Sequence, residues 1–193
     1  MSNPLVAGQT SIQVFGEDKI IGGPYPIPLD ISGRFVPTIE IEHSRIHESA
    51  AFTYSLKAIV LKNTNLDFLI VVNTGKHPHF RDYTFSSTSV PCDIFLYENT
   101  VTLNNGILQE ILNNNRNSSN TCDINLYLKP IITDIGKQIH YDIISEYKSI
   151  GGNVKTIPVE WILQPIEKYL LRLTNNSLKI AIVAVNLFFV NID

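Results

Sequence analysis

The histidines are the side chains whose spacing comes closest to a metal site. Four of them lie in two short segments: His43, His47, His77 and His79. A strand through His77 and His79 would place both imidazoles on one face, and Glu42 or Glu48 would add a carboxylate, as in metal-binding jelly rolls of the cupin type. Pro78 interrupts such a strand, and the spacing matches no compact metal motif. We therefore predict no metal site and interpret these histidines as polar caps of strands or interface residues.

The residues that could act as nucleophiles or bind phosphate do not lie in the sequence motifs typical of those roles. Neither Cys92 nor Cys122 lies in a segment typical of a catalytic nucleophile, and no Gly-x-Ser-x-Gly motif occurs. The doublets Gly22–Gly23 and Gly151–Gly152 lack the lysine and serine that complete a phosphate-binding loop. The aspartates have no spacing that indicates an acid/base pair. The sequence therefore predicts a protein that is not an enzyme and uses no cofactor.

Tyrosines are numerous enough to form a platform for sugars. The candidates are Tyr25, Tyr83, Tyr97, Tyr127, Tyr141 and Tyr147. Carbohydrate-binding modules often use a β-sandwich, but this argument is an analogy from fold alone. Aromatic rings are also enriched in cores and subunit interfaces, and we favour that interpretation.

The only tryptophan and a nearby arginine lie in strand-like segments close to the end of the chain. Trp161 and Tyr169 are predicted to be core or interface anchors. Arg172 alternates with Leu171 and Leu173, which would face the opposite way. We therefore predict that Arg172 is paired at a subunit contact.

A polar run, Asn113–Thr121, separates two strand-like segments. Its short amide and hydroxyl side chains favour turns and local backbone hydrogen bonds. Arg116, between Asn115 and Asn117, could make two parallel hydrogen bonds to a carboxylate of a partner. We name these three residues as interface candidates, and a simple solvated loop stays open as the alternative.

The composition limits the class of partner. The 193 residues are 44% hydrophobic and 17% charged, which is typical of a globular chain rather than a disordered one. The net charge of −3 gives no reason to expect nucleic acid or an anionic membrane as a partner. No signal peptide is predicted, and the longest apolar run, Ile180–Val185, is too short to span a bilayer. The two cysteines cannot support a disulfide framework.

Residues 1–42 differ from the rest of the chain because prolines and glycines are frequent there. The run through Pro24, Tyr25 and Pro26 favours an extended backbone whose polar groups stay free for outside partners. We predict an extended N-terminal arm and place these three residues at an interface. Ordinary edge strands joined by turns remain the alternative.

Residues 43–193 show strand patterns separated by turn signals, and no alternation of strand and helix. Strands are expected at 51–61, 66–72, 79–86, 93–98, 100–103, 122–128, 159–163, 169–174 and 180–190. Residues 107–112 are expected to form a brief helical turn, and residues 139–147 either a strand or a short helix. This pattern predicts an all-β fold, an antiparallel β-sandwich or barrel.

An ordered set of short motifs resembles a family of tailed-phage virion proteins. The set comprises Ile46–Glu48, Leu69–Val71, Phe95–Glu98, Asn115–Ser118, Gly151–Gly152, Glu160–Leu163 and Tyr169–Thr174. Members of the family tend to end in an aromatic and acidic tail, whereas this chain ends in Leu187–Asp193. The resemblance covers residues 43–190 and implies a jelly-roll-like β-sandwich.

The resemblance also implies a function and a place in the virion. It implies an auxiliary capsid protein, made in the cytoplasm of the bacterial host, that decorates and cements the outer surface of the head as a homotrimer. Its partners would be the major capsid protein and other head or fibre proteins, with no nucleic acid and no membrane. A head-fibre module or a receptor- or glycan-binding module is the alternative. The composition, rich in Asn and Ile, would suit an AT-rich genome such as that of a crAss-like phage.

Overall fold

The computed structural model describes residues 11–15, 18–22, 27–29, 41–73, 75–88, 90–144 and 153–191, with side chains for 44–73, 75–88, 90–144 and 160–191. The chain divides into two compact units, Met1–Ser44 and Arg45–Asp193. In the first unit, β1 (Ser11–Phe15), β2 (Asp18–Gly22) and β3 (Ile27–Leu29) pair in an antiparallel sheet of order β1-β2-β3. The interface candidates Pro24, Tyr25 and Pro26 lie outside the described residues.

A short helix, α1 (Ile41–His47), was not expected from the sequence. Its last turn carries Arg45 and His47, where positive charge interacts favourably with the helix dipole. Ser49 ends the helix with a φ of 60°, and its N–H donates to the carbonyl oxygen of Ile46 at 3.0 Å. The Arg45 guanidinium bonds the Glu48 carboxylate at 2.8 Å.

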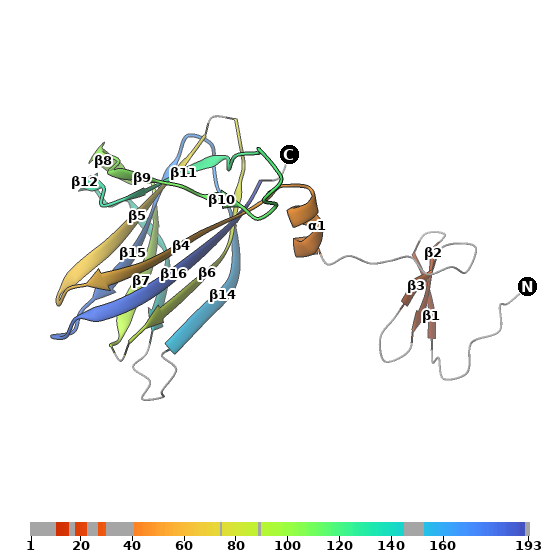
Figure 1. Cartoon of the computed structure of the whole chain (residues 1–193), viewed down its shortest axis with the longest axis horizontal. Helices are drawn as coiled ribbons and strands as arrows, with labels where there is room; N and C mark the ends of the chain where they lie inside the picture. The colour runs from red at the N-terminus through yellow and green to blue at the C-terminus, as the bar shows by residue number, and fades with distance from the viewer. Residues whose placement is uncertain are drawn as a thin grey trace, which may run out of the picture. The chain divides into compact units, whose positions relative to one another are not determined.

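The second unit is a sandwich of two antiparallel sheets (Figure 1). Eight strands form its body: β4 (Ala51–Val60), β5 (Thr64–Val72), β6 (His79–Ser87), β7 (Cys92–Glu98), β13 (Lys137–Ile144), β14 (Asn153–Ile162), β15 (Lys168–Asn175) and β16 (Ala181–Val190). One sheet has the order β10-β4-β16-β6-β14 and the other β13-β7-β15-β5-β11-β9. Apart from the step from β7 to β13, each step along these eight strands changes sheets, which is the connectivity of a jelly roll. The predicted all-β antiparallel sandwich is confirmed.

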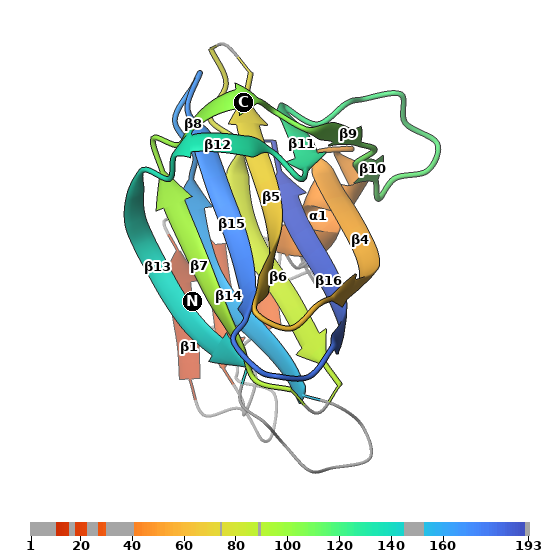
Figure 2. The same ribbon diagram turned by 90° about the vertical axis from the view of Figure 1, so that its left-hand side faces the viewer.

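The chain between β7 and β13 forms an insertion of short strands. These are β8 (Val101–Asn104), β9 (Ile107–Gln109), β10 (Leu112–Asn113), β11 (Ile124–Leu128) and β12 (Ile131–Asp134). Strands β9 to β11 widen the two sheets at their edges, whereas β8 and β12 pair only with each other. In Figure 2, β8 and β12 lie across one end of the six-stranded sheet.

The core lies between the two sheets, and strand periodicity explains its composition. Along β16, alternate residues from Ala181 to Phe189 point inward and are fully buried. Tyr83 and Phe85 of β6 and Leu171 of β15 join them in one hydrophobic cluster. These strands therefore each contribute an apolar face to the core, as expected for a sandwich.

One expectation for an individual segment is wrong, and one alternative that was left open is decided. The brief helical turn expected at 107–112 is wrong, because Gln109 of β9 pairs with Leu126 of β11, and Leu112 of β10 pairs with Thr53 of β4. The described part of residues 139–147 belongs to β13 and is a strand. Pairing with neighbouring strands determines the secondary structure of both segments, and the local sequence pattern does not show which strands will pair.

Candidate functional site

The asparagine-rich loop is tied to the end of α1 by its amide side chains. The Asn113 amide donates to the carbonyl oxygens of Ser49 at 2.9 Å and of Asn120 at 3.2 Å. The Asn115 amide donates to the Ser49 hydroxyl at 2.9 Å, and its side-chain oxygen accepts the N–H of Asn117 at 3.2 Å. The loop is therefore a hydrogen-bonded turn, as short polar side chains favour.

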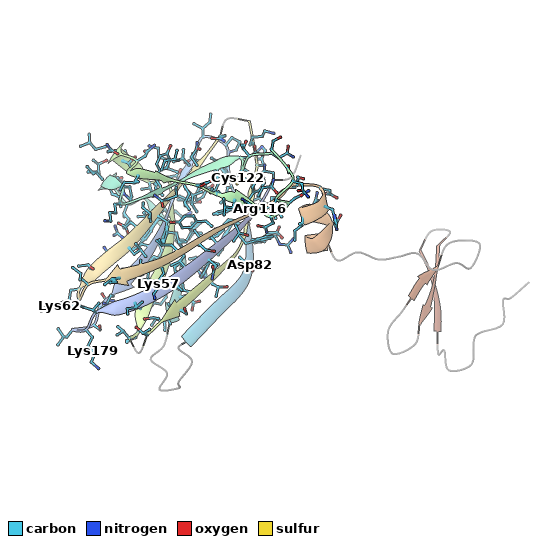
Figure 3. All side chains as sticks on the ribbon, viewed as in Figure 1. Lys57, Lys62, Asp82, Arg116, Cys122 and Lys179 are labelled. Atoms are coloured by element: carbon cyan, nitrogen blue, oxygen red, sulfur yellow. The ribbon has the colours of Figure 1, made fainter. Side chains whose placement is uncertain are left out.

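Arg116 lies at the exposed tip of this loop (Figure 3). It borders a hollow of about 360 Å³ that is also lined by Thr53, Tyr54 and Glu110. Among the described residues, none forms an ion pair or side-chain hydrogen bond with its guanidinium. The loop thus presents Arg116 to solvent, while Asn115 and Asn117 hold the loop in shape.

Trp161 and Tyr169 pack within the sandwich. The Trp161 ring stacks on Phe80, with centroids 5.6 Å apart, and the edge of His140 meets it at 5.2 Å. A bulge in β14 between Pro158 and Trp161 precedes this contact, and such bulges re-aim the side chains that follow. Tyr169 is 4% exposed, and its hydroxyl accepts a backbone N–H at 2.9 Å. Both rings therefore stabilise the fold itself.

Arg172 finds its carboxylate within the same chain. Its Nε donates to Oδ1 of Asp67 at 2.7 Å, and its Nη2 donates to Oδ2 of Asp67 at 2.8 Å. The two residues are directly opposite on β15 and β5. Hydrogen bonding to Asp67 raises the pKa of the Arg172 guanidinium. The structure thus places this predicted interface residue in an ion pair between two strands of one sheet.

The three candidate histidines with described side chains, His47, His77 and His79, form no common site, and the His43 side chain lies outside the described residues. His47 lies in the exposed last turn of α1, and the His79 Nδ1 lies 2.7 Å from a carboxylate oxygen of Glu160. His77 is exposed in the connection before β6. Within the part of the chain that the structure describes, no group of three His, Cys, Asp or Glu side chains is placed to hold a metal ion.

The aromatic platform is smaller than the tyrosine count suggests. Tyr83 is fully buried, and Tyr25 and Tyr147 lie outside the described residues. On the outer face of the six-stranded sheet, Phe95 stacks on Tyr97 at 5.9 Å and meets Tyr141 at 5.1 Å. This short aromatic row is the described surface that best resembles a sugar platform.

Some of the exposed aliphatic side chains form two groups that the sequence patterns did not single out. Near the β8–β12 pair these are Val101, Leu103 and Ile131. Around the β4–β5 and β15–β16 connections they are Ile59, Leu61, Leu178, Ile180 and Ile182. The two places lie at opposite ends of the sandwich in Figure 2. Apolar residues beside Lys62 and Lys179 in turn segments were the one signal available in the sequence.

Comparison with known proteins finds no matching family model and no similar curated protein. Among the described residues, no helix has the length and apolar character needed to cross a membrane.

Proposed function

We propose that the protein is a non-enzymatic virion protein of a tailed phage that decorates the outer surface of the head as a homotrimer. Its main partner is the major capsid protein, and other head or fibre proteins are further candidates. The jelly-roll sandwich agrees with what the resemblance to phage virion proteins implies. Because one fold hosts many functions, the fold alone does not carry this proposal.

The observation that carries the proposal is the pair of exposed aliphatic surfaces at opposite ends of one sandwich. Leu103 is 77% exposed at one end, and Leu178 is 83% exposed at the other. Exposed apolar groups that cluster are typical of surfaces that bind other proteins. In this proposal, one of the two surfaces contacts a neighbouring subunit and the other contacts the capsid.

Avidity supplies the binding strength in this proposal. Three linked subunits engage the capsid together, so modest contacts by each subunit add up to tight attachment. Residues 1–42 extend over the capsid or over a neighbouring subunit, where their strands exchange or add backbone hydrogen bonds. Trp161, Tyr169 and the Arg172–Asp67 pair keep each subunit rigid.

The solution mass of the full-length protein, measured by light scattering after size exclusion, tests the trimer. The proposal expects a compact particle of about three times the 21.7 kDa chain. A monomer at all concentrations would remove the avidity mechanism and would favour an adaptor that assembles only on the virion.

A glycan- or receptor-binding module is the second candidate, and the aromatic row of Phe95, Tyr97 and Tyr141 favours it. Tyr141 is 48% exposed and its hydroxyl donates to Asp93 at 3.1 Å, which orients the ring. Binding to surface polysaccharide of the host that is lost in Tyr141→Ala, with unchanged thermal stability, would support this function over decoration.

A further inference from the structure

One end of the sandwich combines exposed aliphatic side chains with lysines, and we call it the lysine–aliphatic surface. Its aliphatic members are Ile59 (68% exposed), Leu61 (55%), Leu178 (83%), Ile180 (56%) and Ile182 (40%). Its lysines, all exposed and labelled in Figure 3, are Lys57, Lys62 and Lys179. Strand pairing explains the gathering, because Ile59 of β4 lies directly opposite Ile182 of β16. β4 leads from this pair into the β4–β5 turn, and β16 begins there after the β15–β16 loop. These two connections carry the other aliphatic members of the surface.

Hydrogen bonds fix the two turns relative to each other. The Asn175 side chain is fully buried, and its amide donates to the carbonyl oxygens of Leu61 at 3.1 Å and Lys179 at 2.8 Å. The Ser177 hydroxyl donates to the side-chain oxygen of Asn175 at 2.7 Å and accepts the N–H of Lys179 at 3.1 Å. A surface held in this way loses little conformational entropy when it binds.

The charge of this surface is positive, although the whole chain has a net charge of −3. The segments that meet there, 55–66, 84–92 and 173–191, contain no Asp or Glu. None of the described carboxylates forms an ion pair with its lysines. Asp93, at the start of β7, is bonded to Asn176 and Tyr141 instead. The lysines are therefore available to carboxylates of another molecule.

The exposed aliphatic side chains and the positive charge distinguish between three kinds of binding partner: a second copy of the chain, an anionic membrane and a different protein. A second copy packed with the same surface on both subunits would bring like charges together, which opposes binding. A contact of this surface with a different patch of a second copy is an outcome of the test below. An anionic membrane is usually held by four to eight basic residues and by Trp or Tyr at the interface, whereas this surface has three lysines and no aromatic member. A protein surface with aliphatic residues and carboxylates fits best, because its aliphatic residues would cover the apolar side chains and its carboxylates would pair with the lysines.

We propose that the lysine–aliphatic surface is the face that docks on the capsid, and that it binds an acidic, aliphatic region of the major capsid protein. This inference rests on the decoration function proposed above. It adds which end of the jelly roll faces the head and the chemistry of the partner. The aliphatic centre provides burial, and the surrounding lysines select carboxylates and speed association.

Binding of the full-length protein to phage heads that lack it, measured by co-sedimentation over a range of salt concentrations, tests the assignment. The double variant Lys62→Glu/Lys179→Glu should bind at least about tenfold more weakly than the wild type and lose most of its salt dependence. Leu178→Ser should also weaken binding. The matched controls are Lys62→Arg/Lys179→Arg, which keeps both positive charges, and Ile162→Ser, at an exposed position elsewhere on the sandwich, and they should bind as the wild type does.

The outcomes separate this inference from the proposed function. If the wild type binds heads and both double variants bind equally well or equally poorly, the decoration function stands and the docking face is wrong. If the wild type does not bind heads, both the decoration function and the docking face are contradicted. Binding of the wild type to phosphatidylserine vesicles that the Lys62→Glu/Lys179→Glu variant has lost would show a lipid occupant instead. A reduced solution mass of Leu178→Ser would show a second copy, and either result overturns the inference.

Discussion

The side-chain amide of Asn175 donates to the carbonyl oxygen of Lys179 at 2.8 Å, four residues further along the chain. The same amide also reaches the carbonyl oxygens of Val60 and Leu61 at 3.2 and 3.1 Å. One buried side chain thus joins the β4–β5 turn to the β15–β16 loop. These are the two segments that form most of the lysine–aliphatic surface, so Asn175 connects the stability of the sandwich with its proposed docking face.

Asn175→Ala should lower the free energy of unfolding by about 2–3 kcal/mol, because buried carbonyl oxygens lose their donor. Chemical denaturation monitored by Trp161 fluorescence measures this change. Asn186→Ala is the control, since Asn186 is exposed and bonded to Ser55 on the outer face, and it should cost less than about 0.5 kcal/mol. Equal losses in both variants would contradict the anchoring role of Asn175.

The Arg172–Asp67 pair should couple the strands β15 and β5. A double-mutant cycle with Arg172→Gln and Asp67→Asn should give a coupling energy of about 1–2 kcal/mol, since the pair is half-buried and makes two parallel hydrogen bonds. The solution mass should be that of the wild type in all three variants. If Arg172→Gln instead dissociates the trimer without loss of subunit stability, Arg172 acts at a subunit contact, as the sequence had suggested.

Much of the fold follows from the sequence because several body strands carry a period-two pattern of apolar and polar residues. In β16, Ala181, Val183 and Val185 alternate with residues that face outward, and the predicted strand at 180–190 is confirmed. The helix α1 was missed because seven residues give too few turns for a 3.6-residue period. Strands β9 and β10 were missed because pairing with β11 and β4 determines them.

The candidate site was harder to predict because a sequence does not show which partners a side chain finds. Arg172 and Trp161 were named as interface candidates, but the contacts that the structure gives them lie in distant segments of the same chain, at Asp67 and Phe80. The lysine–aliphatic surface joins residues more than a hundred positions apart, such as Ile59 and Ile182. Only the sheet register brings them together.

The Cys122 thiol should make stability depend on alkaline pH. Burial raises its pKa from the ordinary 9.0 to about 12. Because the fold favours the neutral thiol, its contribution is fully present below pH 9 and is lost as the pH rises from 9 towards 12.

Urea unfolding at about pH 8 and about pH 10.5 measures this effect against Cys122→Ala. The wild type should lose about 1–2 kcal/mol more than the variant over this range. The buried tyrosines, whose pKa values are also raised, affect both proteins alike and cancel in the difference. An equal loss in the two proteins would show that the thiol titrates normally.

Deleting residues 1–40, which keeps α1, should leave the jelly roll folded, because the unit Arg45–Asp193 contains its own core. If the N-terminal residues extend over the capsid, the truncated protein should bind heads at least about tenfold more weakly at unchanged thermal stability. Full affinity of the truncated protein would show that these residues are not needed for attachment.

Saturation binding of the full-length protein to phage heads that lack it, at near-physiological salt, is the most decisive test of capsid decoration. A decoration protein should bind saturably, at a fixed ratio to the major capsid protein, with three copies at each site on the outer surface. No binding to heads, or binding that rises without saturation, would contradict a capsid decoration function.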